Sequence, residues 1–554
     1  MIRSIRTDDF TGGLNYDANA FSLDNNQTND ALNVDFNPKG GVSTRWGFKR
    51  LNTTAIGGGG AGSITINRLF AWNNSSRRLL VSTANSIYAY PSTSTPGSLD
   101  NLSITHNATY GASFATWDDD VNNIVYISCG SGNAGRKITG TTVTNLTSSG
   151  TGAWQNDLTN PNGTHMPRSQ MVVAHAERLW VAGTTESSVD YPNRIRFSHP
   201  LFPESWREDD FIDVVAGGPR ITGIVAFNGI LVVFKEKAVF ALYGFNEETF
   251  QLVDISRSVG AVAPNCIAQT ERGIYFFSNP EGVFFYDGTS LKDVFEPIRP
   301  LLIDSEVSEQ AVQGMSMGYA NRRLYLSLPA GQDVVDILAY DSSIEDYDQA
   351  ERNYNGGTQA ALATRTFVYD ETVGKGAWTA YQTSDGFGLI SPTDFLGQDS
   401  KILHVAAHPY QPYLLTIDVR ENGSADNITG TNVAFDSYWT TKWQDAGNVG
   451  AKKFWRRPEI IFRREVDVAS VTVDVYQDWD TFTAVKYFTL TPPEADPNAG
   501  TWESWGEPEF GASHLFADSL GLARSVRLKI SGNTTSPWAV YSIVYRFNPR
   551  KNKV

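Results

Sequence analysis

The chain has 554 residues, of which 41% are hydrophobic and 19% are charged, so its composition excludes global disorder and allows one large core or several ordinary ones. Its 45 Lys and Arg against 60 Asp and Glu give a net charge of −15. This argues against a protein that grips nucleic-acid phosphates, because such a protein needs surplus cations. Two distant cysteines, Cys129 and Cys266, exclude a disulfide framework and a cysteine-rich zinc site. The aromatic residues and 48 glycines favour an all-β protein with many turns.

The first 60 residues are polar and rich in Asn and Asp, with scattered single apolar residues. Residues 31–36 alternate apolar and polar side chains, residues 37–41 are a strong turn signal, and residues 42–48 fit a returning strand. We therefore expect residues 1–60 to form an extended arm that ends in a hairpin. Because such an arm has little core of its own, we expect it to pack on the C-terminal domain or on a neighbouring subunit.

A short apolar element that follows a polar or glycine turn recurs along residues 61–430. Its copies begin at Arg78, Asn123, Arg178, Gly229, Gly273, Arg323 and Lys401. Counted from the first Leu or Ile of each copy, the spacings are 44 to 55 residues, except for the last, which is 78. A period of about 40 to 50 residues with four strands per unit is typical of β-propellers. We predict a degenerate propeller of six or seven blades, since the last copy could belong to a neighbouring domain.

The clearest copy lies between Ala226 and Gly244, where two apolar runs flank a polar turn at residues 235–237 that we expect to be exposed on the rim of a blade. The long last spacing indicates an insertion. The acidic, glycine-ended segment 341–357 fits this insertion as a surface loop. Because no Trp-Asp, kelch or YWTD pattern recurs, a β-solenoid or several β-sandwiches stay open as alternatives.

Strict alternation of apolar and polar residues begins after residue 430. It is clearest in residues 459–463, 471–476, 526–530 and 538–543. Alternation means that one face of each strand is buried and the other is solvated, so residues 431–554 are predicted to form a β-sandwich. No run of eighteen apolar residues occurs, so we expect no membrane span.

The sequence contains only weak candidates for catalytic or metal-binding sites. His404 and His408 are four residues apart, but an HxxxH pair binds metal when both residues share a helix face, and here the context is a strand and a turn. Residues 118–120 are three Asp in a row, without the spacing of a calcium loop. The segment from Tyr369 to Trp378 resembles one sialidase Asp-box, with the Ser missing and the Asp-to-Gly gap altered. We therefore predict no enzyme and no catalytic, cofactor-binding or metal-binding residues.

Basic residues cluster at the two ends of the C-terminal domain. They are Lys452, Lys453, Arg456, Arg457, Arg463, Arg464, Arg546, Arg550, Lys551 and Lys553. One interpretation is a solvated strand face followed by a charged tail. The other is a contact with an acidic protein partner, since the rest of the chain is acidic.

Three short N-terminal patterns carry a family resemblance: Phe10-x-Gly12-Gly13-Leu14-Asn15, then residues 31–34 (ALNV), then residues 40–48 (GGVxxRxGF). Together with Lys453 and Arg456-Arg457 before a terminal alternating-strand domain, they resemble the tail nozzle, or tubular tail protein B, of short-tailed bacteriophages. The resemblance implies a β-propeller and a β-rich platform in one subunit, and a ring of six subunits that continues the tail channel below the head–tail adaptor. It implies no catalytic residues.

The resulting expectation is a structural virion protein of the phage tail, made in the bacterial host cytoplasm. Its expected partners are five further copies of itself, the head–tail adaptor ring, tail fibres or a tip protein, and genomic DNA in transit. An acidic lumen would repel the phosphate backbone and let DNA slide. The alternative hypothesis is a propeller that binds or depolymerises host glycans, and a further one is an intracellular, monomeric propeller scaffold.

Overall fold

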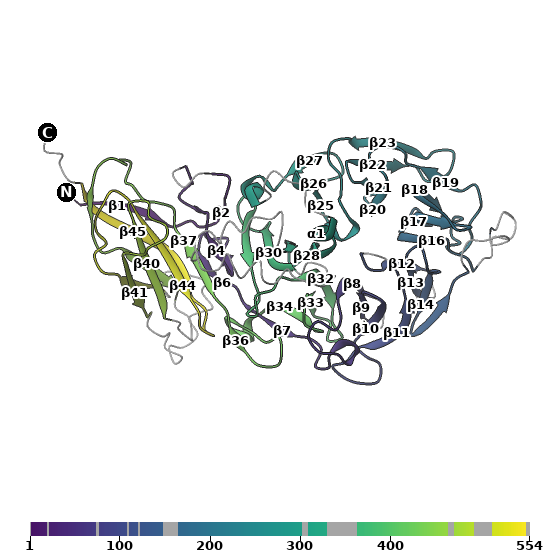
Figure 1. Cartoon of the computed structure of the whole chain (residues 1–554), viewed down its shortest axis with the longest axis horizontal. Coiled ribbons are helices and arrows are strands. Elements are labelled where there is room, and N and C mark those ends of the chain that lie inside the picture. Colours follow the sequence, from purple (N-terminus) through teal and green to yellow (C-terminus); the bar gives the residue numbers. More distant parts are fainter. Residues whose placement is uncertain are drawn as a thin grey trace.

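The computed structural model describes residues 2–18, 22–73, 77–107, 110–119, 122–147, 154, 164–301, 309–329, 363–463, 470–491 and 512–549. Nearly all regular structure within these ranges is β. Figure 1 shows an elongated molecule with a ring of small sheets at one end and a sandwich of longer strands at the other. The predicted insertion at 341–357 and the basic residues Arg464, Arg550, Lys551 and Lys553 lie outside the described residues.

Five antiparallel sheets of four strands follow one another in the first part of the ring. Their strands are β8 (Ile66–Trp72), β9 (Arg78–Thr83), β10 (Ser86–Tyr90) and β11 (Asp100–Thr105); β12 (Ser113–Asp118), β13 (Asn123–Ser128), β14 (Arg136–Thr139) and β15 (Thr142–Asn145); β16 (Arg168–His175), β17 (Arg178–Glu186), β18 (Val189–Phe197) and β19 (Phe211–Asp213); β20 (Ile221–Phe227), β21 (Ile230–Lys235), β22 (Ala238–Tyr243) and β23 (Gln251–Ser256); β24 (Ile267–Gln269), β25 (Ile274–Ser278), β26 (Gly282–Tyr286) and β27 (Leu291–Asp293).

The last two blades share one eight-stranded sheet, because their innermost strands touch in parallel at a single pair, Tyr319 with Thr393. Its strands are β28 (Ser316–Ala320), β29 (Arg323–Pro329), β30 (Ala363–Asp370), β31 (Ala377–Tyr381), β32 (Ile390–Leu396), β33 (Ile402–Ala407), β34 (Leu414–Val419) and β7 (Gly47–Arg50). The outer strand of the seventh blade is therefore β7, which precedes residue 61, where the sequence predicted the propeller to begin.

Seven blades close into a ring because each neighbouring pair shares a hydrophobic cluster. Successive residues of a β-strand point to opposite faces of the sheet. On β9, the second strand of the first blade, Leu79 therefore packs toward the seventh blade and Leu80 toward the second blade. The same alternation places Leu179 and Trp180 in clusters on either side of the third blade. The remaining pairs are joined through Val232 and Phe276, Tyr275 and Leu324, and Tyr325 and Ala406.

The seven predicted repeats are the second strands of the seven blades, so the propeller prediction is confirmed and the number of blades is seven. The predicted turn at residues 235–237 is partly wrong. Lys235 belongs to β21 and is completely buried, and its Nζ donates to the carbonyl oxygen of Val214 at 2.8 Å. The turn is therefore only two residues long, because the blade stack covers the last residue of β21.

Two sheets form the C-terminal sandwich, and both contain N-terminal strands. One consists of β1 (Arg3–Thr7), β5 (Val34–Phe36), β6 (Val42–Thr44), β38 (Lys453–Trp455), β39 (Glu459–Arg463), β42 (Ala512–Phe516), β43 (Gly521–Ala523) and β45 (Ala539–Pro549). The other consists of β4 (Ala31–Leu32), β37 (Ser437–Thr440), β40 (Val471–Gln477), β41 (Lys486–Leu490) and β44 (Val526–Gly532).

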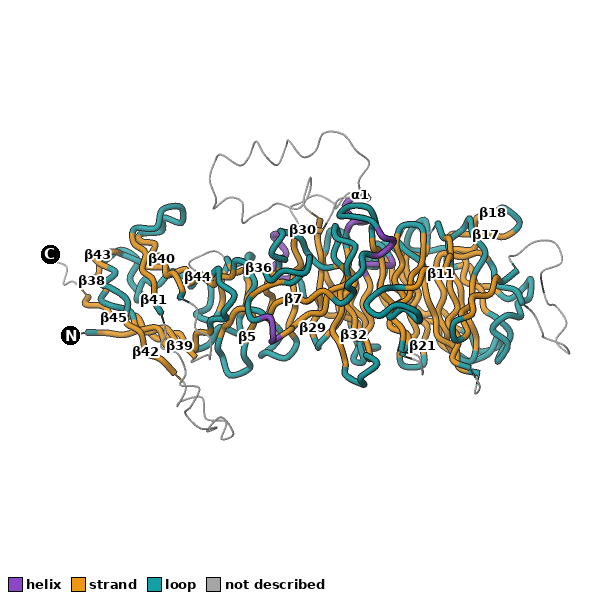
Figure 2. Tube along the Cα trace, turned by 90° about the horizontal axis from the view of Figure 1, so that it is seen from below, coloured by secondary structure: helices purple, strands orange, loops and turns teal. Residues whose placement is uncertain are grey.

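Short elements complete the fold. They are the strand pairs β2 (Gly13–Leu14) with β3 (Gln27–Thr28) and β35 (Ala425–Asp426) with β36 (Val433–Ala434), the 3-10 turns η1 (Ile56–Gly58), η2 (Pro264–Cys266), η3 (Glu296–Leu301) and η5 (Arg420–Asn422), and the helix α1 (Glu309–Gly314). Figure 2 shows the N-terminus at the end of the sandwich farthest from the propeller, and β1 is labelled there in Figure 1.

The N-terminal motifs lie where the sandwich meets the propeller. Phe10 and Leu14 are buried in one continuous core that contains both Trp378 of the sixth blade and Trp439 of the sandwich. Gly47 must be glycine, because a Cβ atom there would collide with the carbonyl oxygen of Ala425. The residues that carry the family resemblance are therefore structural residues of this joint.

Arg45 is the central polar residue of the joint and is completely buried. Its guanidinium binds both carboxylate oxygens of Asp426 at 2.9 Å and is stacked between the rings of Phe48 and Phe435, 3.8 and 3.7 Å away. The remaining donors bind the side-chain oxygen of Asn33 and the carbonyl oxygens of Trp46 and Gln382. All five N–H donors are thus satisfied, as a buried guanidinium requires.

Candidate functional site

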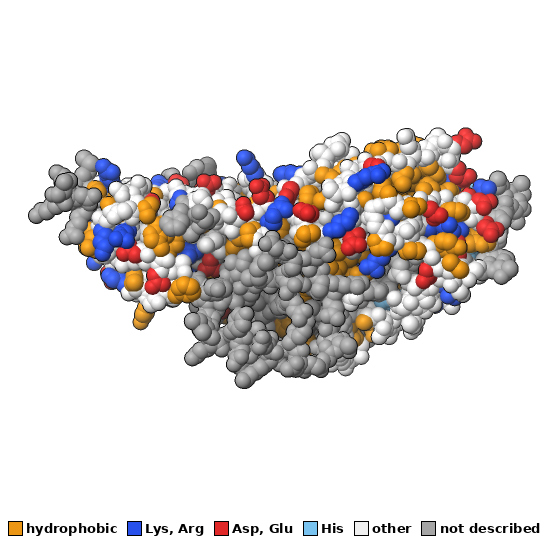
Figure 3. All heavy atoms as spheres, turned by 45° about the horizontal axis from the view of Figure 1, so that its top comes forward, with side chains coloured by type: hydrophobic (Ala, Val, Ile, Leu, Met, Phe, Trp, Pro, Cys, Tyr) orange, Lys and Arg blue, Asp and Glu red, His pale blue; other side chains and the backbone are white. Residues whose placement is uncertain are grey.

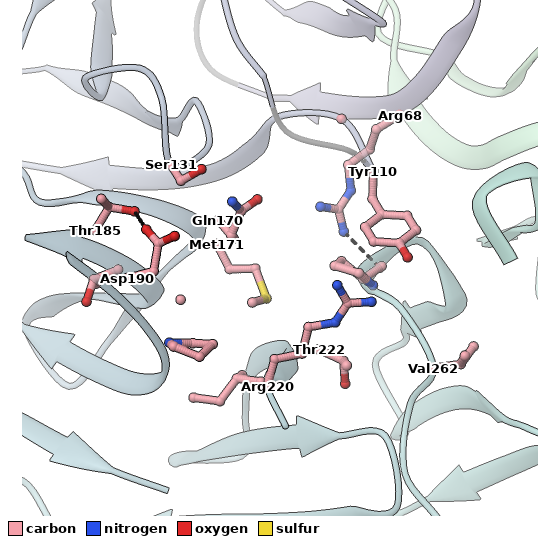
Figure 4. A pocket seen from close by; sticks show the side chains of 16 residues that line it. Arg68, Tyr110, Ser131, Gln170, Met171, Thr185, Asp190, Arg220, Thr222 and Val262 are labelled. Atoms are coloured by element: carbon pink, nitrogen blue, oxygen red, sulfur yellow. Dashed lines mark hydrogen bonds between the residues drawn. The ribbon is translucent and has the colours of Figure 1, made fainter. Parts of the chain in front are cut away.

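A cavity of about 210 Å³ opens near the axis of the propeller, where the innermost strands of several blades converge. Five blades contribute to its lining. The lining residues lie on β8, on β20, on β16, β17 and β18 of the third blade, and in the segments that precede β12 and β24. Figure 4 shows that its labelled side chains come from separate strands and loops around it. A central cavity of this kind is a common place for a ligand, because blades converge there without filling the axis.

One side of the cavity is cationic. Arg68, on β8, and Arg220, directly before β20, direct their guanidinium groups toward each other, with the ring of Tyr110 beside Arg68 (Figure 4). Arg68 donates to the carbonyl oxygen of Pro264 at 3.4 Å, and no carboxylate of the described residues forms an ion pair with it. Burial lowers the pKa of the Arg68 guanidinium, because water is removed and no anion replaces it.

The opposite side of the cavity carries hydrogen-bonding groups and one carboxylate. Asp190 accepts a hydrogen bond from the hydroxyl of Thr185 at 2.6 Å, and it is the one carboxylate among the described residues of the lining. The amide of Gln170 and the apolar side chain of Met171 lie between Asp190 and the two arginines (Figure 4). The arrangement therefore has a cationic end and an end that accepts hydrogen bonds.

A buried ion-pair network stabilises the wall of the cavity beside Asp190. Strands β17 and β18 are nine residues each, longer than the other blade strands, and their hairpin forms this wall. Within it, Glu186 binds Arg196 at 2.7 Å and Arg194 at 3.3 Å and accepts a hydrogen bond from Thr184 at 2.7 Å. Burial alone would raise the pKa of Glu186, but these contacts lower it, so the carboxylate stays charged.

A second candidate site is the far end of the sandwich, hereafter the sandwich-end surface: Phe454, Phe482, Lys486, Tyr487 and Leu522. Phe454 and Leu522 are paired on neighbouring strands with exposures of 46% and 41%, and Tyr487 is 77% exposed. Lys486 bridges the β40–β41 hairpin to the carbonyl oxygen of Ser519 at 2.9 Å. On the face shown in Figure 3, Lys and Arg side chains stand beside hydrophobic ones over this end of the molecule.

The two histidines of the HxxxH pattern have separate roles. His404 Nδ1 lies 2.6 Å from a carboxylate oxygen of Asp394. His408 is completely buried, with Nε2 3.1 Å from Asp385, and its Nδ1 accepts the backbone N–H groups of Tyr410 and Gln411. His404 thus forms a cross-strand pair between β32 and β33, whereas His408 stabilises a turn. No group of three His, Cys, Asp or Glu in the described part of the chain is arranged to hold a metal ion.

The acidic and Asp-box-like segments are also turns. Asp119 accepts the backbone N–H of Asn122 in the β12–β13 turn, whereas Asp120 lies outside the described residues. Asp370 accepts the N–H of Thr372 at 2.8 Å, and Trp378 is buried with its Nε1 donating to the carbonyl oxygen of Val294 at 2.8 Å. No described residue of either segment lines the axial cavity.

The basic cluster is only partly solvated. Lys453 is buried and donates to the carbonyl oxygen of Arg524 at 2.8 Å, so for this residue the solvated-face interpretation is wrong. Arg457 is 69% exposed and lies 3.9 Å from Asp518. Arg546 is bound to Glu459. No helix among the described residues has the length and apolar character to cross a membrane.

Sequence patterns did not point to the axial cavity. Its polar lining residues extend from Arg68 to Thr222 in the chain, and each looks like an ordinary strand or turn residue in its own blade. These residues come together only when the ring closes, so the repeat pattern in the sequence does not by itself indicate this site.

No protein-family model matches the chain, and no curated protein matches it. Among solved structures, it is similar to the extracellular domain of a putative one-component system from B. thetaiotaomicron. That similarity has 10% identity and a TM-score of 0.40, and covers 88% of this chain and 57% of that chain. It is also similar to an ancestral GH74 enzyme, at 7% identity and a TM-score of 0.38, over 68% of this chain and 53% of that chain. The chain thus spans little more than half the length of either.

Proposed function

We propose that this chain is a structural protein of a short phage tail, the tail nozzle, which assembles as a ring of six copies around the path of the DNA. The N-terminal motifs support the proposal through the family that they resemble. The ring would lie below the head–tail adaptor and would dock tail fibres or a tip protein. The chain itself would then be a component of the virion tail.

The observation that carries the proposal is the sandwich-end surface. It combines exposed aromatic and aliphatic side chains with the cation Lys486, and residues 437–554 carry 15 Lys and Arg against 13 Asp and Glu. The remaining residues carry 30 against 47 and are strongly acidic. A patch that complements a different surface of an identical copy forms a head-to-tail contact, and repeated contacts of this kind form a ring when the rotation from copy to copy closes.

The acidic remainder of the chain supports a role in conducting DNA. A lumen lined by carboxylates repels phosphates, so DNA passes without being held. A surface that held DNA in place would instead need to be positively charged.

The test is the assembly of the purified full chain, imaged by negative-stain electron microscopy and sized by light scattering. We expect six-fold rings. The double variant Phe454→Asp with Leu522→Asp should remain monomeric. Ile402→Asp, at an apolar residue of the propeller that is 63% exposed, should assemble normally. A ring of another number would overturn the stoichiometry, and a monomer at all concentrations, or rings in the double variant, would overturn the assembly role of this surface.

The axial cavity favours a second candidate, a propeller that binds host glycans. Cleavage of a glycosidic bond usually needs two carboxylates on opposite sides of the bond, and the described lining contributes one, Asp190. We therefore propose binding without cleavage as the alternative. A glycan array together with a reducing-sugar release assay separates binding, depolymerisation and a purely structural role.

A further inference from the structure

We propose that the axial cavity of the propeller is a binding site for an acidic sugar residue, a hexuronate in its carboxylate form. This site goes beyond the assembly role and does not depend on it.

A planar carboxylate fits the cationic end. Among the described residues, Arg68 has one side-chain hydrogen bond, to the carbonyl oxygen of Pro264, so these residues leave most of its five donors to a ligand. Arg220, directly before β20, approaches from another blade, so the two guanidinium groups converge from different blades (Figure 4). Guanidinium groups bind carboxylates in a fork of two parallel hydrogen bonds, which is stronger than a contact between neutral groups.

Hydroxyl groups fit the other end. Asp190 can accept hydrogen bonds from a ligand, and Gln170 can both donate and accept. The Asp190 carboxylate would repel a ligand that is anionic at both ends. Sugar hydroxyls supply the donors that Asp190 needs, whereas inorganic phosphate or sulfate supplies few or none. The ring of Tyr110 and the side chain of Met171 offer apolar surface for the C–H groups of a pyranose.

The size of the cavity limits the ligand to about one residue. Its 210 Å³ is below the roughly 300–1,000 Å³ of pockets for drug-sized ligands. One end of a chain, or a single side residue of an acidic polysaccharide, would enter, and the rest of the polymer would stay outside. The site is therefore suited to recognise a terminal or branching uronate.

The test measures binding of glucuronic acid and galacturonic acid to the full chain by calorimetry and by saturation-transfer NMR. Glucose, acetate and inorganic phosphate are the comparison ligands. We expect saturable binding of at least one uronate, at least tenfold weaker binding of glucose and acetate, and no competition by phosphate at equal concentration. Phosphate that competes equally would overturn the sugar assignment, and absence of saturable uronate binding would overturn the site.

Three variants locate the site. Arg68→Gln should weaken uronate binding at least tenfold, and Arg68→Lys should weaken it less, because it keeps the charge but loses the fork. Arg257→Gln is the matched control, since Arg257 is 69% exposed and pairs only locally with Asp254 among the described residues. Ser131→Trp narrows the cavity without touching either arginine and should also abolish binding. Unchanged uronate affinity in both Arg68→Gln and Ser131→Trp, with unchanged melting temperatures, would refute the proposal.

Discussion

At the scale of single residues, buried charges set the stability of this molecule. Arg45 is the clearest case, because its guanidinium spans residues of the sandwich and of the propeller and leaves no donor unsatisfied. Its partner Asp426 also accepts the backbone N–H groups of Phe48 and Ser384 at 2.9 and 2.8 Å. Removing either member would leave a buried charge without compensation, which costs more than the pair itself contributes.

The variants Arg45→Met and Asp426→Asn should each lower the free energy of unfolding by about 4 kcal/mol. Lys49→Ala is the control, because Lys49 and Glu421 form an ion pair at 3.5 Å with exposures of 50% and 83%, and such pairs contribute less than about 1 kcal/mol. Urea unfolding followed by circular dichroism measures all three. Losses of similar size in the control and in the buried pair would contradict this account.

His165 connects stability to pH. It is 2% exposed, and burial, helped by the positive charge of Arg196, lowers the pKa of His165 to about 4. The unfolded chain therefore takes up a proton near pH 6.5 while the folded chain does not, so stability is lost as pH falls from about 6.5 to 4. Relative to His165→Gln, the wild type should lose about 3 kcal/mol over this range. Parallel unfolding curves at pH 7 and pH 4 measure the difference, and a constant difference would argue against a neutral buried imidazole.

At the scale of elements, the second strand of each blade determines the fold. In the first, fourth and fifth blades, for example, these strands are buried on both faces, so they appear in the sequence as unbroken apolar runs that are easy to detect. In the seventh blade, β33 is exposed at its start. The outer strands are short and partly exposed, and their patterns are correspondingly weak. The most consequential of them is β7, which comes from the N-terminal segment and pairs with β34 to complete the seventh blade.

A cross-link between β7 and β34 should stabilise the propeller. Lys49 and Thr416 are directly opposite in an antiparallel pair, where the separation of Cα atoms permits a disulfide. Lys49→Cys with Thr416→Cys, when oxidised, should raise the stability by about 2–4 kcal/mol, because it closes a very long loop in the unfolded chain. Thermal unfolding with and without reductant uses the reduced protein as its own control. Equal melting temperatures would show that opening at β7 does not limit stability.

At the scale of the whole molecule, one hydrophobic cluster joins the sandwich to the fifth and sixth blades. It contains Trp378 and Trp439 from the two parts, together with residues of the N-terminal segment. Domains that share a continuous core cannot lose one part without exposing the other, so we expect them to unfold together.

Heat unfolding of the wild type should therefore give one transition, with coincident curves from circular dichroism and tryptophan fluorescence. Asp426→Asn weakens the joint and should separate the sandwich and propeller transitions. Two well-resolved transitions in the wild type would mean that the two parts are energetically independent despite the shared core.

By itself, the sequence determined the all-β class, the propeller and the alternating strands of the sandwich. These features depend on local periodicity, which burial on two faces or on one face imposes directly on the chain. The position of residues 1–50 was decided only by the tertiary structure, because short strands such as β4 and β7 carry too few residues to specify a partner. The same holds for the axial cavity and for the burial of Lys235: both depend on which distant blades become neighbours when the ring closes, and no local pattern records that choice.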